Sequence, residues 1–170
     1  KFERKKLSNV LLVTMTEYDK NLSALNAFES ADVKQPLAKI ISESGLKQFH
    51  IAETEKYAHI TYFFNGGREE PFENEDRKMI ESPQVESFEE APEMSADKIS
   101  DEVINNLQNY NFLAINFANA DMVGHTGNLE ATSKAIETLD SNLRKIIDKI
   151  LEIDGAIIIT ADHGNAEEKL

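Results

Sequence analysis

The clearest hydrophobic pattern in the sequence lies in residues 129–152, where apolar side chains recur at every third or fourth position. This spacing places them on one face of an α-helix, and such a face is normally buried against a core. Asn128 precedes the pattern as an N-cap residue, and Gly155 follows it as a residue that readily ends a helix. The apolar positions are Ile136, Leu139, Leu143, Ile146, Ile147 and Ile150. We therefore predict one long amphipathic helix here.

Shorter apolar stretches predict strands and two further helices. We expect strands at 9–15, 48–53, 56–64, 112–118 and 156–160, of which 56–64 alternates and ends in the turn sequence NGG. We expect helices at 37–43, closed by Gly45, and at 95–107, with Ser95 as N-cap. Residues 16–36 indicate a loop or linker, and the acidic, proline-containing residues 69–94 indicate an ordered but irregular segment.

The order of these elements predicts the fold class. Helix, strand, helix and strand follow one another over 95–160, which is typical of βαβ units. We therefore predict an α/β fold with a mainly parallel sheet flanked by helices.

Composition and charge narrow the classes of function. The formal net charge of −13 at pH 7 argues against nucleic acid and anionic membranes as partners. The longest apolar runs have about seven residues, far fewer than the ~20 that a membrane-spanning helix needs. There is no cysteine, so disulfides and thiolate chemistry are excluded, and a cytoplasmic location is the simplest expectation.

Two polar segments each follow a predicted parallel strand: NFANADMVGHTGN at 116–128 and TADHGNAEE at 160–168. Ligands of open α/β sheets bind beyond the carboxyl ends of the strands, so both segments should face one crevice. Asp121 and His125 are four residues apart and share one face if their segment is helical. Asp162 and His163 are adjacent, and a turn at Gly164 allows both to approach one site. Two such pairs suit two divalent cations, Mn²⁺ or Zn²⁺. Helix capping or surface ion pairing is the alternative for each pair.

Three other polar residues carry weaker signals. Lys56 follows a predicted strand and could contact a phosphate, but its spacing favours a solvated lysine paired with Glu53 or Glu55. His50 and His59 lie in predicted strands without a carboxylate-bearing loop, and we interpret them as packing or surface residues.

The motifs together resemble a known family. The segments IAETEKYAHITYFFNGGRE, SPQV, PEMSA, NFANADMVGHTGN and IITADHGNAEE occur in the order and at the spacing found in cofactor-independent phosphoglycerate mutases. The resemblance extends from about Val10 to the end of the sequence. It implies that residues 1–35 are the tail of an inserted transferase domain with its linker. It also implies that residues 36–170 are the C-terminal part of an alkaline-phosphatase-like, metal-binding domain.

The resemblance further implies the interconversion of 2- and 3-phosphoglycerate, a glycolytic reaction, through a phosphoserine intermediate. Two Mn²⁺ ions are expected, with Mg²⁺ or Zn²⁺ as alternatives. Asp121 and His125 match ligands of one ion, Asp162 and His163 match ligands of the other, and Lys56 matches the lysine that contacts the transferring phosphate.

The nucleophilic serine, one further aspartate and one further histidine of the family have no counterpart in residues 1–170. We therefore expect this chain to be a C-terminal fragment without activity of its own, and we nominate no nucleophile. An incomplete sheet would expose an unpaired edge, which predicts self-association. Two alternatives stay open: another hydrolase or mutase of the alkaline phosphatase superfamily, or a non-catalytic acidic interaction domain.

Overall fold

The computed structural model describes residues 8–19, 21–29 and 33–168. The chain divides into two compact units, residues 1–34 and residues 35–170. Each unit has its own sheet, and they are described separately below.

The first unit contains two very short parallel strands, β1 (Val13–Thr14) and β2 (Leu25–Asn26). The predicted strand at 9–15 is therefore reduced to two residues, and the predicted loop at 16–36 contains a strand. Apolar side chains of this unit, such as Leu11, are largely exposed, because strands of two residues cannot enclose a core.

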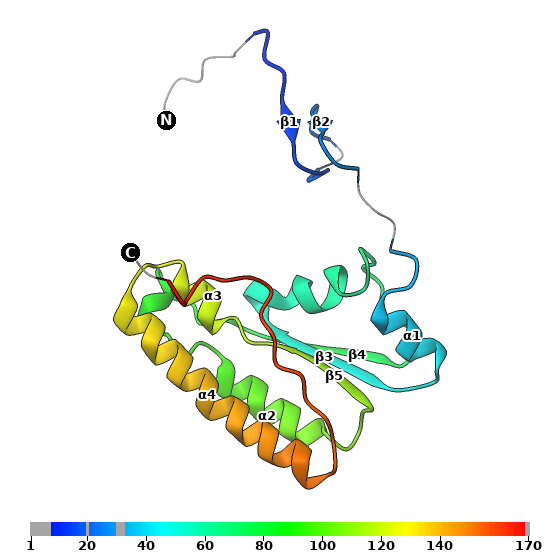
Figure 1. Ribbon diagram of the computed structural model, residues 1–170, viewed down its shortest axis with the longest axis vertical. Coiled ribbons are helices and arrows are strands. Elements are labelled where there is room, and N and C mark those ends of the chain that lie inside the picture. The colour runs from blue at the N-terminus through cyan, green and yellow to red at the C-terminus, as the bar shows by residue number, and fades with distance from the viewer. Residues whose placement is uncertain (1–7, 20, 30–32, 169–170) are drawn as a thin grey trace. The chain divides into compact units, whose positions relative to one another are not determined.

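The second unit is built around a three-stranded parallel sheet in the order β4-β3-β5 (Figure 1). The central strand β3 (Gln48–Glu53) is buried along its whole length, and β4 (Glu75–Ile80) and β5 (Phe112–Asn116) flank it. The predictions of a parallel sheet and of a strand at 48–53 are confirmed. Strand β4 lies within 69–94, so the prediction of a wholly irregular segment there is wrong.

Among the described residues, four α-helices accompany this sheet: α1 (Leu37–Glu43), α2 (Ala96–Asn106), α3 (Asn119–Gly124) and α4 (Leu129–Glu152). Helix α4 has the predicted bounds, and the Asn128 side chain accepts a hydrogen bond from the Ala131 amide at 3.0 Å, as an N-cap does. Ser95 stands at the N-cap position of α2, but its hydroxyl donates instead to the Glu81 carbonyl at 2.7 Å. None of the helices among the described residues has the length and apolar character that a bilayer crossing requires.

Helices α2 and α4 cover one face of the sheet, and the main core lies between them and β3 (Figure 1). Side chains alternate between the two faces of a strand. Phe49 and Ile51 of β3 therefore enter this core, whose buried members also include Ile99, Val103, Leu107 and Ile146. Burial of each of these large side chains contributes about 2 kcal/mol. The intervening β3 residues face the opposite side of the sheet.

That opposite side holds the largest departure from the predicted elements. The sequence pattern predicts a strand at 56–64, but the chain makes a 3-10 turn, η1 (Thr54–Lys56), and then a π-helical turn, η2 (His59–Phe63). The π-turn packs against β3 and β5. The buried residues of the π-turn, Ile60 and Thr61, are consecutive, so the alternation of this segment does not mark a strand.

The predicted strand at 156–160 is also absent. Its apolar residues suit a buried strand, yet Ile158 is 92% exposed and no ladder of hydrogen bonds forms. A strand exists only where a neighbouring strand offers its free edge in register. In the described part of the chain, β5 pairs with β3 alone, so its outer edge is free, but residues 156–160 form no ladder with it. A short 3-10 turn, η3 (Phe88–Glu90), completes the elements of this unit.

Candidate metal and phosphate site

The first half of the candidate site lies directly beyond β5. Helix α3 begins at Asn119, and Asp121 lies in its first turn, where a carboxylate suits the positive end of the helix. His125 follows one turn later, and its Nε2 is 3.2 Å from Asp121 Oδ1. The expectation that these two side chains share one helix face is therefore met.

The second half comes from residues 160–168, which follow the exposed apolar segment. Here the chain bends, and the Asp162 carboxylate accepts a hydrogen bond from the His163 amide at 3.0 Å. His163 Nε2 lies 3.6 Å from Asp162 Oδ2 and 3.9 Å from Asp121 Oδ1. Both segments therefore reach one place, although residues 121 and 162 are far apart in the sequence.

Asn165 connects the segment at 160–168 to helix α3 through hydrogen bonds to Asp121. Its side-chain amide donates to the Asp121 carboxylate at 2.8 Å and to the Asp121 backbone carbonyl at 3.1 Å. Its role is not predicted from the residue pattern, although it stands within the DHGN motif at 162–165. Its proximity to His163 in the sequence was the only sign of a role in the site. That sign is weak, because asparagine is equally common in turns.

Lys56 lies beside Asp121, His125, Asp162 and His163, and we call these five residues the cluster. Its side chain is only 8% exposed, and its ammonium contacts the Asp121 carboxylate and lies 3.8 Å from Asp162 Oδ2. The expectation of a solvated lysine paired with Glu53 or Glu55 is wrong. The 3-10 turn after β3 directs the Lys56 side chain sideways towards the end of β5, a placement that sequence spacing does not reveal.

The ammonium sets the charge state of Asp121. Partial burial raises the pKa of this carboxyl, but the hydrogen bonds from Lys56 and Asn165 outweigh it and hold the pKa below its ordinary value. Asp121 is therefore ionised at neutral pH. Its negative charge is shared between Lys56, Asn165 and the imidazole of His125.

The donor set fits divalent cations. Two carboxylates and two imidazoles are the ligand types that Mn²⁺, Co²⁺ and Zn²⁺ accept. Among the described residues, no three histidine, aspartate or glutamate side chains are arranged to hold an ion as they stand. The Lys56 ammonium lies beside both carboxylates, in contact with Asp121 and 3.8 Å from Asp162 Oδ2.

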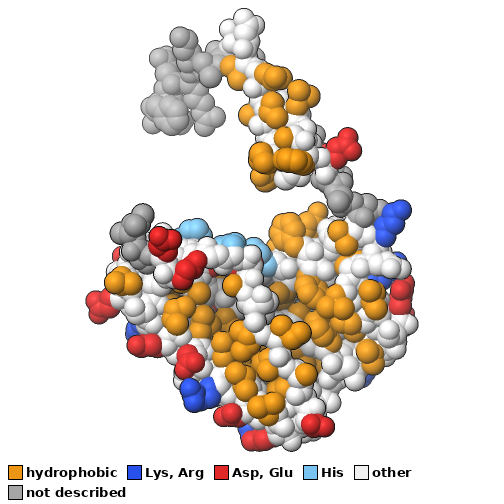
Figure 2. Space-filling model, in the orientation of Figure 1, with side chains coloured by type: hydrophobic (Ala, Val, Ile, Leu, Met, Phe, Trp, Pro, Cys, Tyr) orange, Lys and Arg blue, Asp and Glu red, His pale blue; other side chains and the backbone are white. Residues whose placement is uncertain are grey.

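The histidines of the site are accessible. The side chains of His125 and His163 are 67% and 53% exposed, and Figure 2 shows histidines at the surface of the second unit beside acidic side chains. Their exposure leaves room for further groups to approach the cluster. The cluster combines the buried Lys56 ammonium and the ionised Asp121 carboxylate with two exposed imidazoles. Such a set is suited to binding an anion together with metal ions.

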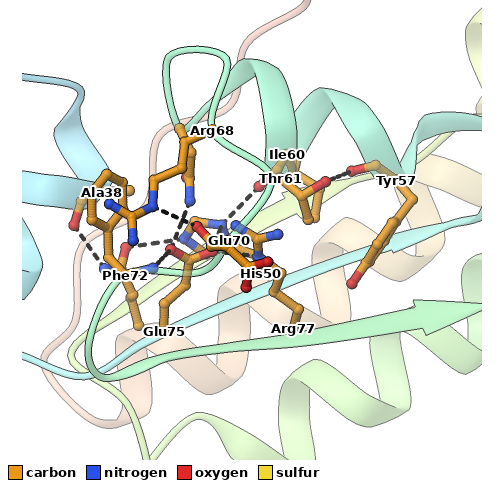
Figure 3. Close-up of polar contacts among 12 residues, drawn as sticks. Ala38, His50, Tyr57, Ile60, Thr61, Arg68, Glu70, Phe72, Glu75 and Arg77 are labelled. Atoms are coloured by element: carbon orange, nitrogen blue, oxygen red, sulfur yellow. Dashed lines mark hydrogen bonds and ion pairs between the residues drawn. The ribbon is translucent and has the colours of Figure 1, made fainter. Parts of the chain in front are cut away.

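The other two histidines differ from each other. His59 is exposed in the π-turn and stacks edge-on against Phe63. His50 is completely buried in β3, within a network of polar side chains on the face of the sheet opposite α2 and α4 (Figure 3). It is more than an ordinary packing residue, because both of its ring nitrogens have polar partners.

Comparisons with known proteins agree with this geometry. The sequence matches the metalloenzyme superfamily over residues 12–169. The 2,3-bisphosphoglycerate-independent phosphoglycerate mutase of Clostridium acetobutylicum is 51% identical over 172 residues, which covers 99% of this chain and 34% of that protein. The mutase of the same name from Sulfurimonas denitrificans is 52% identical over 158 residues, covering 92% of this chain and 32% of that protein.

A solved structure is also similar. The phosphoglycerate mutase of Leishmania mexicana, crystallised at low cobalt concentration, superposes with a TM-score of 0.81 and 36% identity. The match covers 92% of this chain and 29% of that one. The chain thus spans about a third of the length of the relatives it matches. Because the superfamily match extends over far more than half of the sequence, the chain belongs to the metalloenzyme superfamily.

Proposed function

We propose that this chain is part of a metal-dependent phosphoglycerate mutase, which interconverts 2- and 3-phosphoglycerate through a phosphoserine intermediate. The observation that carries the proposal is the convergence of Lys56, Asp121, His125, Asp162 and His163 at one end of the parallel sheet. The similar proteins named above are phosphoglycerate mutases, which favours this reaction over other chemistry of the superfamily.

Each side chain has a role in this proposal. Asp121 and His125 would hold one divalent cation, and Asp162 and His163 would hold a second, with Mn²⁺ as the proposed metal. Bound cations of this kind neutralise phosphate charge and make a hydroxyl easier to deprotonate. Asn165 keeps Asp121 oriented, since it donates to the carboxylate from the opposite loop.

Lys56 would bind the transferring phosphate. Its ammonium is buried and already compensates carboxylate charge, so it can exchange these carboxylate contacts for phosphate oxygens. Burial strengthens that interaction, because charges attract more strongly away from water. No residue of this chain is proposed as the nucleophile.

Two further assignments belong to the same proposal. Residues 1–35 would be the tail of an inserted transferase domain with its linker, and residues 36–170 the C-terminal part of the metal-binding domain. The cytoplasm, where glycolytic substrates occur, is the proposed location.

A domain exchange tests the reaction. The matching third of the Clostridium acetobutylicum mutase is replaced by this chain, and conversion of 3- to 2-phosphoglycerate is assayed with Mn²⁺ and with chelator. We expect metal-dependent activity that is lost in the Asp162→Asn variant. The matched control is Asp140→Asn, which removes an exposed carboxylate on α4 and should change nothing.

Calorimetric titration of the exchanged protein with Mn²⁺ provides a second measurement. Binding that weakens in Asp162→Asn but not in Asp140→Asn supports the assigned ligands. An exchanged protein that folds, binds no Mn²⁺ and shows no turnover would contradict the proposed function.

A further inference from the structure

The π-turn that follows Lys56 leaves one backbone carbonyl without a partner from the turn itself. The Phe64 amide donates to the His59 carbonyl, five residues back, at 3.2 Å. The next amide, of Asn65, donates to the Thr61 carbonyl, four residues back, at 3.0 Å. The Ile60 carbonyl is therefore passed over where the spacing changes from five to four. Such widened turns are rare and occur frequently at functional sites.

His50 supplies the missing donor. Its Nδ1 lies 2.7 Å from the Ile60 carbonyl oxygen, and the ring is completely buried in the central strand (Figure 3). A carbonyl oxygen can only accept a hydrogen bond, so Nδ1 must carry a proton. The ring also packs edge-on against Phe64 and Phe112, which fixes its orientation.

The other ring nitrogen belongs to a chain of contacts whose protons can be counted. His50 Nε2 lies 3.0 Å from Gln48 Oε1, and Gln48 Nε2 donates to the Ala38 carbonyl at 2.8 Å. Both ends of the chain, the carbonyls of Ala38 and Ile60, accept only. A glutamine amide and a neutral imidazole each present one donor and one acceptor along such a chain. A neutral ring therefore leaves two acceptors facing each other, and only the imidazolium completes all three contacts.

Charged groups surround the ring from the neighbouring strand. The Glu75 carboxylate, also buried, lies 3.6 Å from His50 Nδ1, and Arg77 donates to the same carboxylate at 2.5 Å. Burial lowers the pKa of the His50 imidazole and Arg77 lowers it further, whereas Glu75 and the Ile60 carbonyl oppose this. The contact from Nδ1 to Ile60 persists in either charge state, because Nδ1 keeps its proton in both.

We propose that His50 is a positioning residue for Lys56, and that its Nδ1–H holds the π-turn behind Lys56 against the central strand. Ile60 lies one helical turn after Lys56. Without the bond to its carbonyl, the turn can relax to the four-residue spacing of an α-helix, which rotates the preceding residues relative to the sheet. The Lys56 ammonium would then lose its place beside Asp121. The inference rests on the proposed function, in which Lys56 binds phosphate.

The direct test leaves the chain unaltered. Nitrogen NMR of the His50 ring reports which nitrogen is protonated. We expect a protonated Nδ1 at every pH at which the chain is folded, with Nε2 alone gaining or losing its proton. A neutral ring protonated only at Nε2 would overturn the proposal, because Ile60 would then have no donor.

A variant tests the consequence for Lys56. His50→Phe keeps an aromatic ring between Phe64 and Phe112 but removes both donors. We expect the Phe64 and Asn65 amides to exchange with solvent roughly tenfold to a hundredfold faster, since a buried carbonyl loses its partner. Acetylation of Lys56 should accelerate by a similar factor, while the Ile51 amide, in the centre of β3, keeps its protection.

The matched control is His59→Phe, the same substitution at the exposed histidine of the π-turn, with Lys78 as an internal reference for acetylation. Unchanged Lys56 reactivity in folded His50→Phe would overturn the inference. These readouts need neither metal nor phosphate, so they stay separate from the Mn²⁺ titration that tests the proposed function. If His50→Phe fails to fold, nitrogen NMR of the unaltered chain still tests the Nδ1–H bond to Ile60, without which the inference fails.

Discussion

The Lys56 ammonium contacts the Asp121 carboxylate, and each side chain is largely hidden from water, with 8% and 14% exposed. The two residues come from segments that follow neighbouring parallel strands, β3 and β5. A buried ion pair of this kind is costly to break at one end, because the remaining charge has no compensation. The ion pair links Lys56, the proposed phosphate-binding residue, to Asp121, a proposed metal ligand.

The first prediction concerns the strength of this pair. Lys56→Met should lower the free energy of unfolding by about 3 kcal/mol, because Asp121 keeps its charge without its main partner. Lys56→Met combined with Asp121→Asn should lose much less than the sum of the two single changes. Urea denaturation of the four proteins checks this. Simple additivity of the two single effects would show that the contact contributes little.

The second prediction concerns the effect of Asn165 on metal affinity. Asn165→Ala removes the amide that donates to the Asp121 carboxylate from the opposite loop. In the exchanged mutase, Mn²⁺ affinity should fall roughly 10- to 100-fold, as is typical when a group that orients a metal ligand is lost. Calorimetry measures the affinity. Asn109→Ala, in the loop between α2 and β5, is the control and should leave it unaltered.

The third prediction is that the buried carboxyl of Glu53 makes the free energy of unfolding depend on pH. The residue is completely buried, and this burial raises its pKa above the ordinary value, although Ser82 and the Ser95 backbone lower it in part. The folded chain therefore binds this proton more tightly than the unfolded chain, so stability is lost as the pH rises above the unfolded pKa. Glu53→Gln should be more stable than the parent at pH 8, with the difference shrinking towards pH 4.

Denaturation at a series of pH values measures this difference. Glu55→Gln, an exposed neighbour in the 3-10 turn, should show no such trend. If the parent and Glu53→Gln differ by the same amount at every pH, the titration of Glu53 does not contribute to stability.

The unpaired outer edge of β5 and the exposed segment at 156–160 predict self-association. The apparent mass from light scattering should rise with protein concentration, and Ile158→Lys should suppress the rise. Leu129→Lys, which alters an exposed leucine at the start of α4, is the matched control. A constant monomer mass at all concentrations would contradict this expectation.

The final prediction is that the isolated chain has no mutase turnover. None of its serines is proposed as the nucleophile, and the chain spans about a third of the length of its relatives. A coupled assay with 3-phosphoglycerate and Mn²⁺ should give a rate equal to that of the Asp162→Asn variant. Turnover above that background would show that a nucleophile lies within residues 1–170.

Several elements were predictable because their cause is local. Residues 129–152 have apolar side chains at helical spacing and a capping asparagine, and the helix has the predicted bounds. The i, i+4 relation of Asp121 and His125 follows from helix geometry alone. The strand at 48–53 was also predicted with its observed bounds.

Other features depended on partners distant in the sequence. Residues 56–64 alternate like a strand, yet a π-turn forms there whose free carbonyl is bound by His50 from β3. Residues 156–160 have the composition of a buried strand, yet in the described part of the chain they do not pair with the free outer edge of β5. Neither outcome is encoded in the spacing of the residues concerned.

The sequence by itself determined the α/β class, the main helix and four of the proposed site residues, because periodicity and short-range spacing control these features. Only the tertiary structure decided that Lys56 is buried beside Asp121, that Asn165 joins the two loops, and that His50 binds the Ile60 carbonyl of the π-turn. The physical reason is that a charge or carbonyl removed from water must find its partner wherever the fold provides one. That partner here lies on another strand or loop.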